Sequence, residues 1–341
     1  MAQTEITEAH SVLDESGRSH NFGWARSPYF IYEPSLLKAP RRSITQSDRY
    51  ILLSPTHLIL FEILDDGYLG YFCVSVASMR DKKRNSKTYM TPFPLGSFAL
   101  PKDSEADSII YRQKKIQINF ANMEKGVRII KLEIPGFGKN RGLMGKVVLT
   151  PLPDAESMVT HMPWRGEKDA FLYSRRSPCY SAEGVIRFGT TEIVFIQGDG
   201  WGILDWTRGV RPRSDLGFWA AGCGQIDGRQ AGFSVGYNSA DSSLGTDNAF
   251  FLDGKLHKLD RVSFHIPSGR NVPWRFTSND NRLEMIFTPH HERDENHQMF
   301  FYSLKRRQLF GSFSGRAVLD DSSEFTFQDI KGITERRKSR L

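Results

Sequence analysis

The sequence is poor in cysteine, because its 341 residues include only Cys73, Cys179 and Cys223. These three are far apart, odd in number and form no C-x-x-C motif, which argues against a disulfide framework and against a zinc knuckle. Each is expected to be a small core residue. This cysteine usage is typical of a reducing compartment, so we expect a cytoplasmic protein.

Long apolar stretches are also missing. The longest, around YILLSPTHLILFEIL, is interrupted by the polar and proline residues at 54–57 and is too short to span a bilayer. The first twenty residues, MAQTEITEAHSVLDESGRSH, are polar and acidic and lack the apolar segment of a signal peptide. The sequence therefore predicts neither a transmembrane segment nor a secretory leader.

Several catalytic and cofactor motifs are absent. GSFSG at 311–315 is not a G-x-S-x-G nucleophile motif, and the stretches GFGKNRG and GDGWG lack the following helix of a phosphate or dinucleotide loop. There is no H-E-x-x-H, and the adjacent His290 and His291 of FTPHHERDENH would face opposite sides of a strand. We therefore expect no metal and no cofactor.

The net charge of +7 and the pI near 9.2 raise the question of an acidic partner. The basic stretches lack the ordered aromatic and basic alternation of an RNA-binding sheet, so no nucleic-acid partner is expected. Part of the charge lies in the tail KGITERRKSRL, which we interpret as a solvated end. A remote alternative is a protein-interaction module that uses this tail; cutting after Gly332 would then leave the fold intact.

The sequence is rich in pairs of alternating apolar runs joined by turn residues such as DDG, GTT and DG. Long helical periodicity is almost absent. Hairpins in series predict an all-β protein of antiparallel barrels or sandwiches. Residues 78–110 are expected to form a long loop, and a Pro-rich polar stretch at 150–171 marks a boundary. We predict two barrel domains, residues 1–160 and 161–341, each of about the length of one calycin barrel.

The stretch GILDWTRGVRPR at 202–213 combines one carboxylate with a tryptophan and three arginines. On a strand, Asp205 and Thr207 share one face, and Trp206 and Arg208 share the other. If Asp205 faced an apolar barrel, burial would raise its pKa, and a protonated carboxyl is a usable general acid. The alternative is a structural ion pair between Asp205 and a nearby arginine.

A second group of candidates follows this stretch. In GTDNAFFLDG, Asp247 and Asn248 would line the barrel mouth, with Asp247 as a second acid or base; the alternative is ordinary turn chemistry. Tryptophans and other rings would supply an apolar wall. The candidate catalytic residues are Asp205 and Asp247, and the candidate ligand-binding residues are Trp201, Trp206, Arg208, Trp219, Tyr237, Asn248 and His290.

Motifs spread over nearly the whole chain carry a family resemblance: GRSHNFGWARSPYF, LYSRRSPCYSAEGVIRFG, GILDWTRGVRPR, GFSVGYN, TDNAFFLDGKLHKL, VPWRF, FTPHHER and FGSFSGRAVLDD. By these motifs the chain resembles the domain-of-unknown-function family 2804. That family is similar to the calycin group of carotenoid 1,2-hydratase (hydroxyneurosporene synthase) and AttH-type proteins. The resemblance implies two consecutive antiparallel lipocalin-like (calycin) barrels packed together. In the related hydratases a carboxylic acid protonates an alkene and water adds, without a cofactor.

These observations lead to one main expectation of function. The protein would bind a small apolar or amphipathic molecule, isoprenoid-like or lipid-like, in a barrel pocket and perform cofactor-free hydration or isomerisation. Asp205 would be the acid, and Arg208 would tune it or bind a polar head group. The alternative is a carrier that binds such a molecule without turnover, in which the aspartates organise the barrel.

Overall fold

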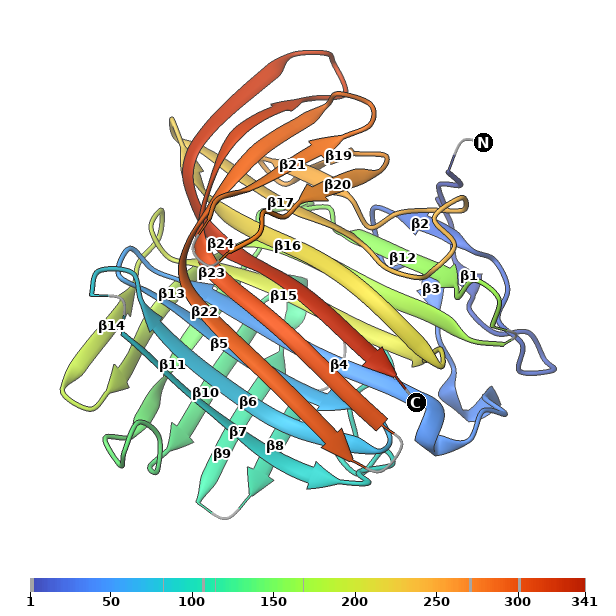
Figure 1. Cartoon of the computed structure of the whole chain (residues 1–341), viewed down its shortest axis with the longest axis horizontal. Coiled ribbons are helices and arrows are strands. Elements are labelled where there is room, and N and C mark those ends of the chain that lie inside the picture. Colours follow the sequence, from blue (N-terminus) through green and yellow to red (C-terminus); the bar gives the residue numbers. More distant parts are fainter. Residues whose placement is uncertain are drawn as a thin grey trace.

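The computed structural model describes residues 3–340 except 82, 106–107, 114, 168, 270–271 and 300–301. Within these residues the chain is almost entirely β (Figure 1). Its helical elements there are short 3₁₀ turns, η1 (Pro34–Leu36), η2 (Arg41–Ser43) and η3 (Glu124–Gly126). None of the described segments forms a helix that is long and apolar enough to cross a membrane.

Thirteen strands form the first sheet, which curls around its own core. Its main path runs in the order β7 (Arg84–Pro92), β6 (Leu69–Ser78), β5 (His57–Asp65), β4 (Ile44–Leu53), β15 (Trp201–Val210), β13 (Phe171–Phe188), β11 (Leu143–Thr150), β10 (Arg128–Ile134), β9 (Ile116–Asn122) and β8 (Ile109–Gln113). β13 also pairs with β14 (Thr191–Phe195) and with β12 (Met158–Pro163), which in turn pairs with β2 (Gly23–Ala25).

Nine strands form the second sheet. Their order is β19 (Lys255–Lys258), β18 (Ala249–Leu252), β17 (Arg229–Tyr237), β16 (Ser214–Ile226), β24 (Glu324–Arg340), β23 (Tyr302–Val318), β22 (Leu283–Met299), β21 (Trp274–Ser278) and β20 (Val262–His265). All pairings in both sheets are antiparallel; the separate pair of β1 (His10–Ser11) and β3 (Phe30–Ile31) is parallel. The prediction of an all-β protein with two antiparallel lipocalin-like barrels is confirmed.

The hairpins follow the turn residues that the sequence displays. Strands β18 and β19 are joined by Asp253 and Gly254, whose φ angles are 49° and 79°. Two consecutive positive φ angles are what a tight two-residue hairpin turn requires, and Asp-Gly adopts them readily. This turn matters for the site because it folds the motif TDNAFFLDGKLHKL back on itself.

Each curled sheet encloses a filled apolar core. Tyr50, Phe61, Phe72 and Phe120 lie inside the first, and the second is packed with Phe233, Phe250, Phe276 and Phe313. A third cluster lies between the sheets, where the outer faces of β4, β5 and β15 meet β16, β23 and β24 (Figure 1). The two sheets therefore pack back to back, and the layer between them is where they can jointly form a site.

The change from the first sheet to the second occurs between Val210 and Ser214. β13 and β15 belong to the first sheet although they follow the expected boundary at residue 160. The division into domains 1–160 and 161–341 stays a prediction. Within the expected loop at 78–110, Arg84–Pro92 forms the edge strand β7.

The interpretation of the basic tail as a solvated end is wrong. Residues 324–340 form β24, which pairs with β16 on one side and with β23 on the other. Its charged side chains alternate, so that Arg336, Lys338 and Arg340 are exposed while Glu335 is buried. A cut after Gly332 would therefore remove half of a central strand.

Candidate functional site

A cleft opens in the layer between the two sheets and has two adjoining parts. The inner pocket, of about 110 Å³, lies among β4, β13, β15, β16 and β24. The outer pocket, of about 470 Å³, lies beside β17 and β20. Tyr237, Asn238 and Asp247 line both parts. Ligand pockets in proteins are commonly about 300–1,000 Å³, so the outer pocket has room for a small molecule and the inner one for a single polar group.

Strand β15 sends alternate side chains to opposite sides, as the sequence predicts. Asp205 and Thr207 line the inner pocket. Trp206 points the other way into the first core, where its ring meets that of Tyr173 edge-on at 4.9 Å. Arg208 lies on the same inward face, with its guanidinium 4.4 Å from the centre of the Trp206 ring. The two faces of β15 therefore lie in two different environments, the inner pocket and the interior of the first barrel.

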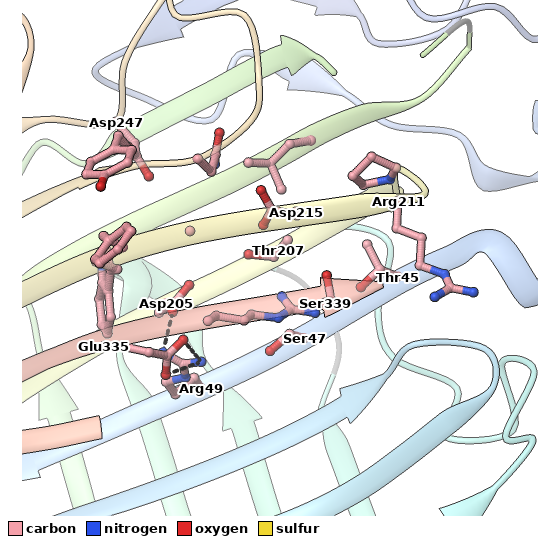
Figure 2. A pocket seen from close by; sticks show the side chains of 18 of the residues that line it. Thr45, Ser47, Arg49, Asp205, Thr207, Arg211, Asp215, Asp247, Glu335 and Ser339 are labelled. Carbon is pink, nitrogen blue, oxygen red and sulfur yellow. Dashed lines mark hydrogen bonds and ion pairs between the residues drawn. The ribbon is translucent and has the colours of Figure 1, made fainter. Parts of the chain in front are cut away.

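Asp205 forms ion pairs with arginines from other strands. Its carboxylate forms an ion pair with Arg176 on β13 and lies 3.2 Å from Nη1 of Arg49 on β4. Figure 2 shows Asp205 pointing toward Arg49 across the floor of the inner pocket. Arg208 is the arginine nearest to Asp205 in sequence, but it lies on the opposite face of β15. It is fully buried and pairs with Asp48 at 2.7 Å instead.

The floor of the inner pocket is a fixed array of charges. Arg49 lies 3.0 Å from Glu62 and 3.3 Å from Glu335, and Glu62 also pairs with Arg306. Burial by itself raises the pKa of Glu62, but Arg306 and Arg49 outweigh it and hold that pKa well below its usual range. Since these groups are buried and mutually paired, they keep their charges and hold the two sheets in register.

Asp247 is paired more loosely than Asp205. Its ion pair with Nη2 of Arg176 spans 3.9 Å, well beyond the 3.2 Å between Asp205 and Arg49. The Asp247 side chain is about nine-tenths buried and lies at the junction of the inner and outer pockets. It is thus a carboxyl that a molecule in the cleft can reach from two sides.

The segment that carries Asp247 is held by Lys258 at the far end of the same hairpin. Lys258 donates from Nζ to Thr246 Oγ1 at 2.7 Å and to the backbone carbonyl of Asn248 at 3.3 Å. Asn248 in turn accepts from the backbone N–H of Gly236 at 2.6 Å. Burial lowers the pKa of Lys258 to about 7, although Asp247 and two further aspartates oppose this shift.

Aromatic rings form one wall of the cleft. Trp219 lies beneath the guanidinium groups of Arg49 and Arg176, at 5.2 and 6.0 Å from its ring centre. Phe218 stacks on Tyr237 with ring centres 4.8 Å apart. A flat wall of this kind suits a ligand with an apolar or unsaturated body.

The structure therefore brings some of the predicted residues together and separates others. Asp205, Asp247, Trp219 and Tyr237 line the inner pocket, and Asn248 lines the outer one. The remaining four lie elsewhere: Trp201 is in the apolar cluster between the sheets, Trp206 and Arg208 are inside the first barrel, and His290 is at a bulge of β22.

Sequence reasoning overlooked Arg49, Glu62, Glu335 and Lys258. A signal for two of them was present, because Arg49 precedes the apolar run YILL and Glu62 interrupts LILFEIL. A charge inside an apolar strand is rarely buried unless it is paired. Across the described ranges, no three histidine, cysteine or acidic side chains gather in a way that could hold a metal ion.

Comparisons with known proteins add a family. No curated protein matches the sequence. Kievitone hydratase from Nectria haematococca is a similar solved structure, with 9% identity, a TM-score of 0.43 and coverage of 86% of this chain and 88% of that one. An AttH-type protein from Nitrosomonas europaea is similar at 16% identity and a TM-score of 0.47, covering 86% of this chain and 91% of that one. The family model described as Domain of unknown function (DUF2804) matches residues 3–341, and the chain belongs to that family.

Proposed function

We propose that the protein binds a small amphipathic molecule in the cleft between its two sheets and that Asp247 exchanges a proton with it. The observation that carries this proposal is the position of Asp247, a nearly buried carboxyl at the junction of two adjoining pockets. The site lies between the barrels, since aromatic side chains fill the interior of each curled sheet.

The linings of the two pockets suit different parts of a ligand, an apolar body and a polar end. In the outer pocket, Met162, Val262 and Phe264 offer apolar contact beside Tyr237. In the inner pocket, Arg176 and other charged groups offer hydrogen bonds. An amphipathic molecule would place its apolar body in the larger space and a hydroxyl, carbonyl or carboxylate in the smaller one.

The two aspartates have different roles in this proposal. Asp205 forms ion pairs with two guanidinium groups, so its task is to hold Arg176 and Arg49 in place. Asp247 is free of such close pairing and can give a proton to an alkene or enol carbon, or take one from it. This is cofactor-free acid–base chemistry of the hydratase or isomerase kind.

The first test is whether the protein carries a ligand. Native mass spectrometry of gently purified protein, followed by solvent extraction, should reveal a bound amphipathic compound. Asp247→Asn should abolish turnover of that compound or of close analogues while binding persists. Asp199→Asn, the same chemical change at an exposed turn residue, is the matched control and should turn over like the wild type.

Two results would contradict the proposal in different ways. If the compound binds but wild type and Asp247→Asn both leave it unchanged in water-¹⁸O and deuterium exchange assays, the protein is a carrier. If blocking the outer pocket with Ser242→Trp leaves binding unchanged, the ligand lies outside this cleft.

A further inference from the structure

Cys179 and Cys223 come from different sheets and meet in the layer between them. Cys179 is on β13 of the first sheet and Cys223 is on β16 of the second, and both belong to the apolar cluster that joins the sheets. The two side chains face each other beside Gly232 of β17. Two cysteines brought together from packed sheets can form a disulfide when their side chains approach closely enough.

Gly232 shows how closely the two side chains approach. It pairs with Cys223 across β16 and β17. A Cβ at residue 232 would lie 2.3 Å from Sγ of Cys179 and 3.0 Å from Cβ of Cys223. The sulfur of Cys179 therefore occupies the space that any other residue at position 232 would fill, directly beside Cys223.

The backbone of β13 directs Cys179 toward the second sheet. The register of β13 against β15 shifts between Ser177 and Tyr180, and Cys179 has a φ of 71°, in the left-handed region that few residues other than glycine adopt. Its carbonyl accepts from Nε2 of Gln230 on β17 at 2.6 Å. Cys179 also lines a pocket of about 450 Å³ at this end of the layer, which gives small reagents a route to it.

We propose that Cys179 and Cys223 are a redox-sensitive pair that a peroxide converts into a disulfide joining the two sheets. In the first step, the sulfur of Cys179 attacks a peroxide oxygen, the O–O bond breaks, and a sulfenic acid and water form. In the second step, the sulfur of Cys223 attacks that sulfur, the S–S bond forms, the S–O bond breaks, and a second water leaves. The two thiols lose two electrons and two protons, and the peroxide gains them.

The disulfide would act on the cleft because both strands also line it. β13 carries Arg176 and β16 carries Trp219, two residues of the inner pocket. A covalent bond between these strands limits how far the two sheets can separate. Burial raises the pKa of the Cys179 thiol well above its usual range, so oxidation needs sustained exposure to peroxide.

The test treats the full-length protein with hydrogen peroxide, alkylates the remaining thiols after denaturation, and maps the peptides without reduction. We expect a cross-linked pair of peptides containing Cys179 and Cys223, with Cys73 still alkylated. Cys73 is the internal control because it is buried on β6 in a different apolar cluster from the other two cysteines. Cys73→Ala should form the same cross-link, and Cys223→Ala should not.

A thermal scan gives the second readout. The oxidised wild type should unfold several degrees above the reduced protein, and dithiothreitol should reverse this shift. The proposal is overturned if peroxide depletes all three thiols equally, if Cys179 becomes a sulfinic acid without a cross-link, or if the product is a dimer of two chains.

Discussion

The interior of the first barrel and the layer between the two sheets both bury arginines, but they surround them differently. Arg208 is sealed inside the barrel, where it pairs with Asp48 and its Nε donates to the carbonyl of Pro101 at 2.8 Å. Arg49 and Arg176 share carboxylates and face an open pocket. A buried charge that is enclosed on all sides serves the fold, whereas one that lines a cavity is also available to a ligand.

The sealed pair should be the more costly to break. Burial raises the pKa of Asp48, and the positive charge of Arg208 opposes this rise. Arg208→Met leaves Asp48 buried without its cation, and we expect a loss of about 3–5 kcal/mol in the free energy of unfolding, measured by urea denaturation. Arg187→Met, which breaks an exposed pair with Glu192, is the control and should cost less than about 1 kcal/mol. Equal losses for the two variants would refute the distinction.

Breaking the floor of the cleft should have a smaller effect. Asp205→Asn removes the charge that faces Arg176 and Arg49, but Arg49 keeps Glu62 and Glu335. The expected loss is about 1.5–3 kcal/mol, the range for hydrogen bonds to charged groups, again by urea denaturation. A change within error would mean that Asp205 is not part of the structural array.

The hairpin behind Asp247 should make stability depend on pH. The pKa of Lys258 is lowered to about 7 in the folded protein, against an unperturbed 10.5, so the unfolded chain binds more protons above pH 7. The free energy of unfolding should therefore rise between pH 7 and 8.5, by at most about 1.4 kcal/mol per pH unit. Lys258→Met should flatten this rise. An unchanged slope in the variant would assign the pH dependence to other groups.

The smallest effect on stability is expected at the proposed reacting carboxyl. Asp247→Asn loses a long contact with Arg176 and an electrostatic interaction with Lys258 but breaks no close ion pair, so the free energy of unfolding should change by less than about 1 kcal/mol. Differential scanning calorimetry of Asp247→Asn beside Asp205→Asn checks this order. If Asp247→Asn proves the more damaging, Asp247 is a structural residue like Asp205.

A structural feature can be predicted from the sequence when neighbouring residues determine it. The turn at Asp253 and Gly254 and the alternation of Asp205 with Trp206 are set by neighbouring residues, and both are readable from the sequence. The partners of Asp205 are set by pairing between distant strands, because Arg49 lies on β4 and Arg176 on β13. No spacing along the chain encodes those pairings.

The misread tail illustrates the same limit. Arg336, Lys338 and Arg340 suggest a charged end when they are counted, yet their spacing of two is that of a strand with one exposed face. The buried position of Glu335 follows from Arg49 and Arg306, which reach it from two other strands. The composition of the tail alone predicts an exposed end, and only the strand pairing of β24 shows that one of its faces is buried.

The position of β24 between β16 and β23 also determines how late in synthesis β16 gains its second neighbouring strand. About 110 residues separate Ser214, where β16 begins, from Glu324, where β24 begins. At roughly 5–20 residues per second, the ribosome leaves the edge of β16 without its final neighbour for about 5–20 seconds. During that time the unpaired edge can attract other nascent chains, so slow translation of the last third should favour aggregation over folding.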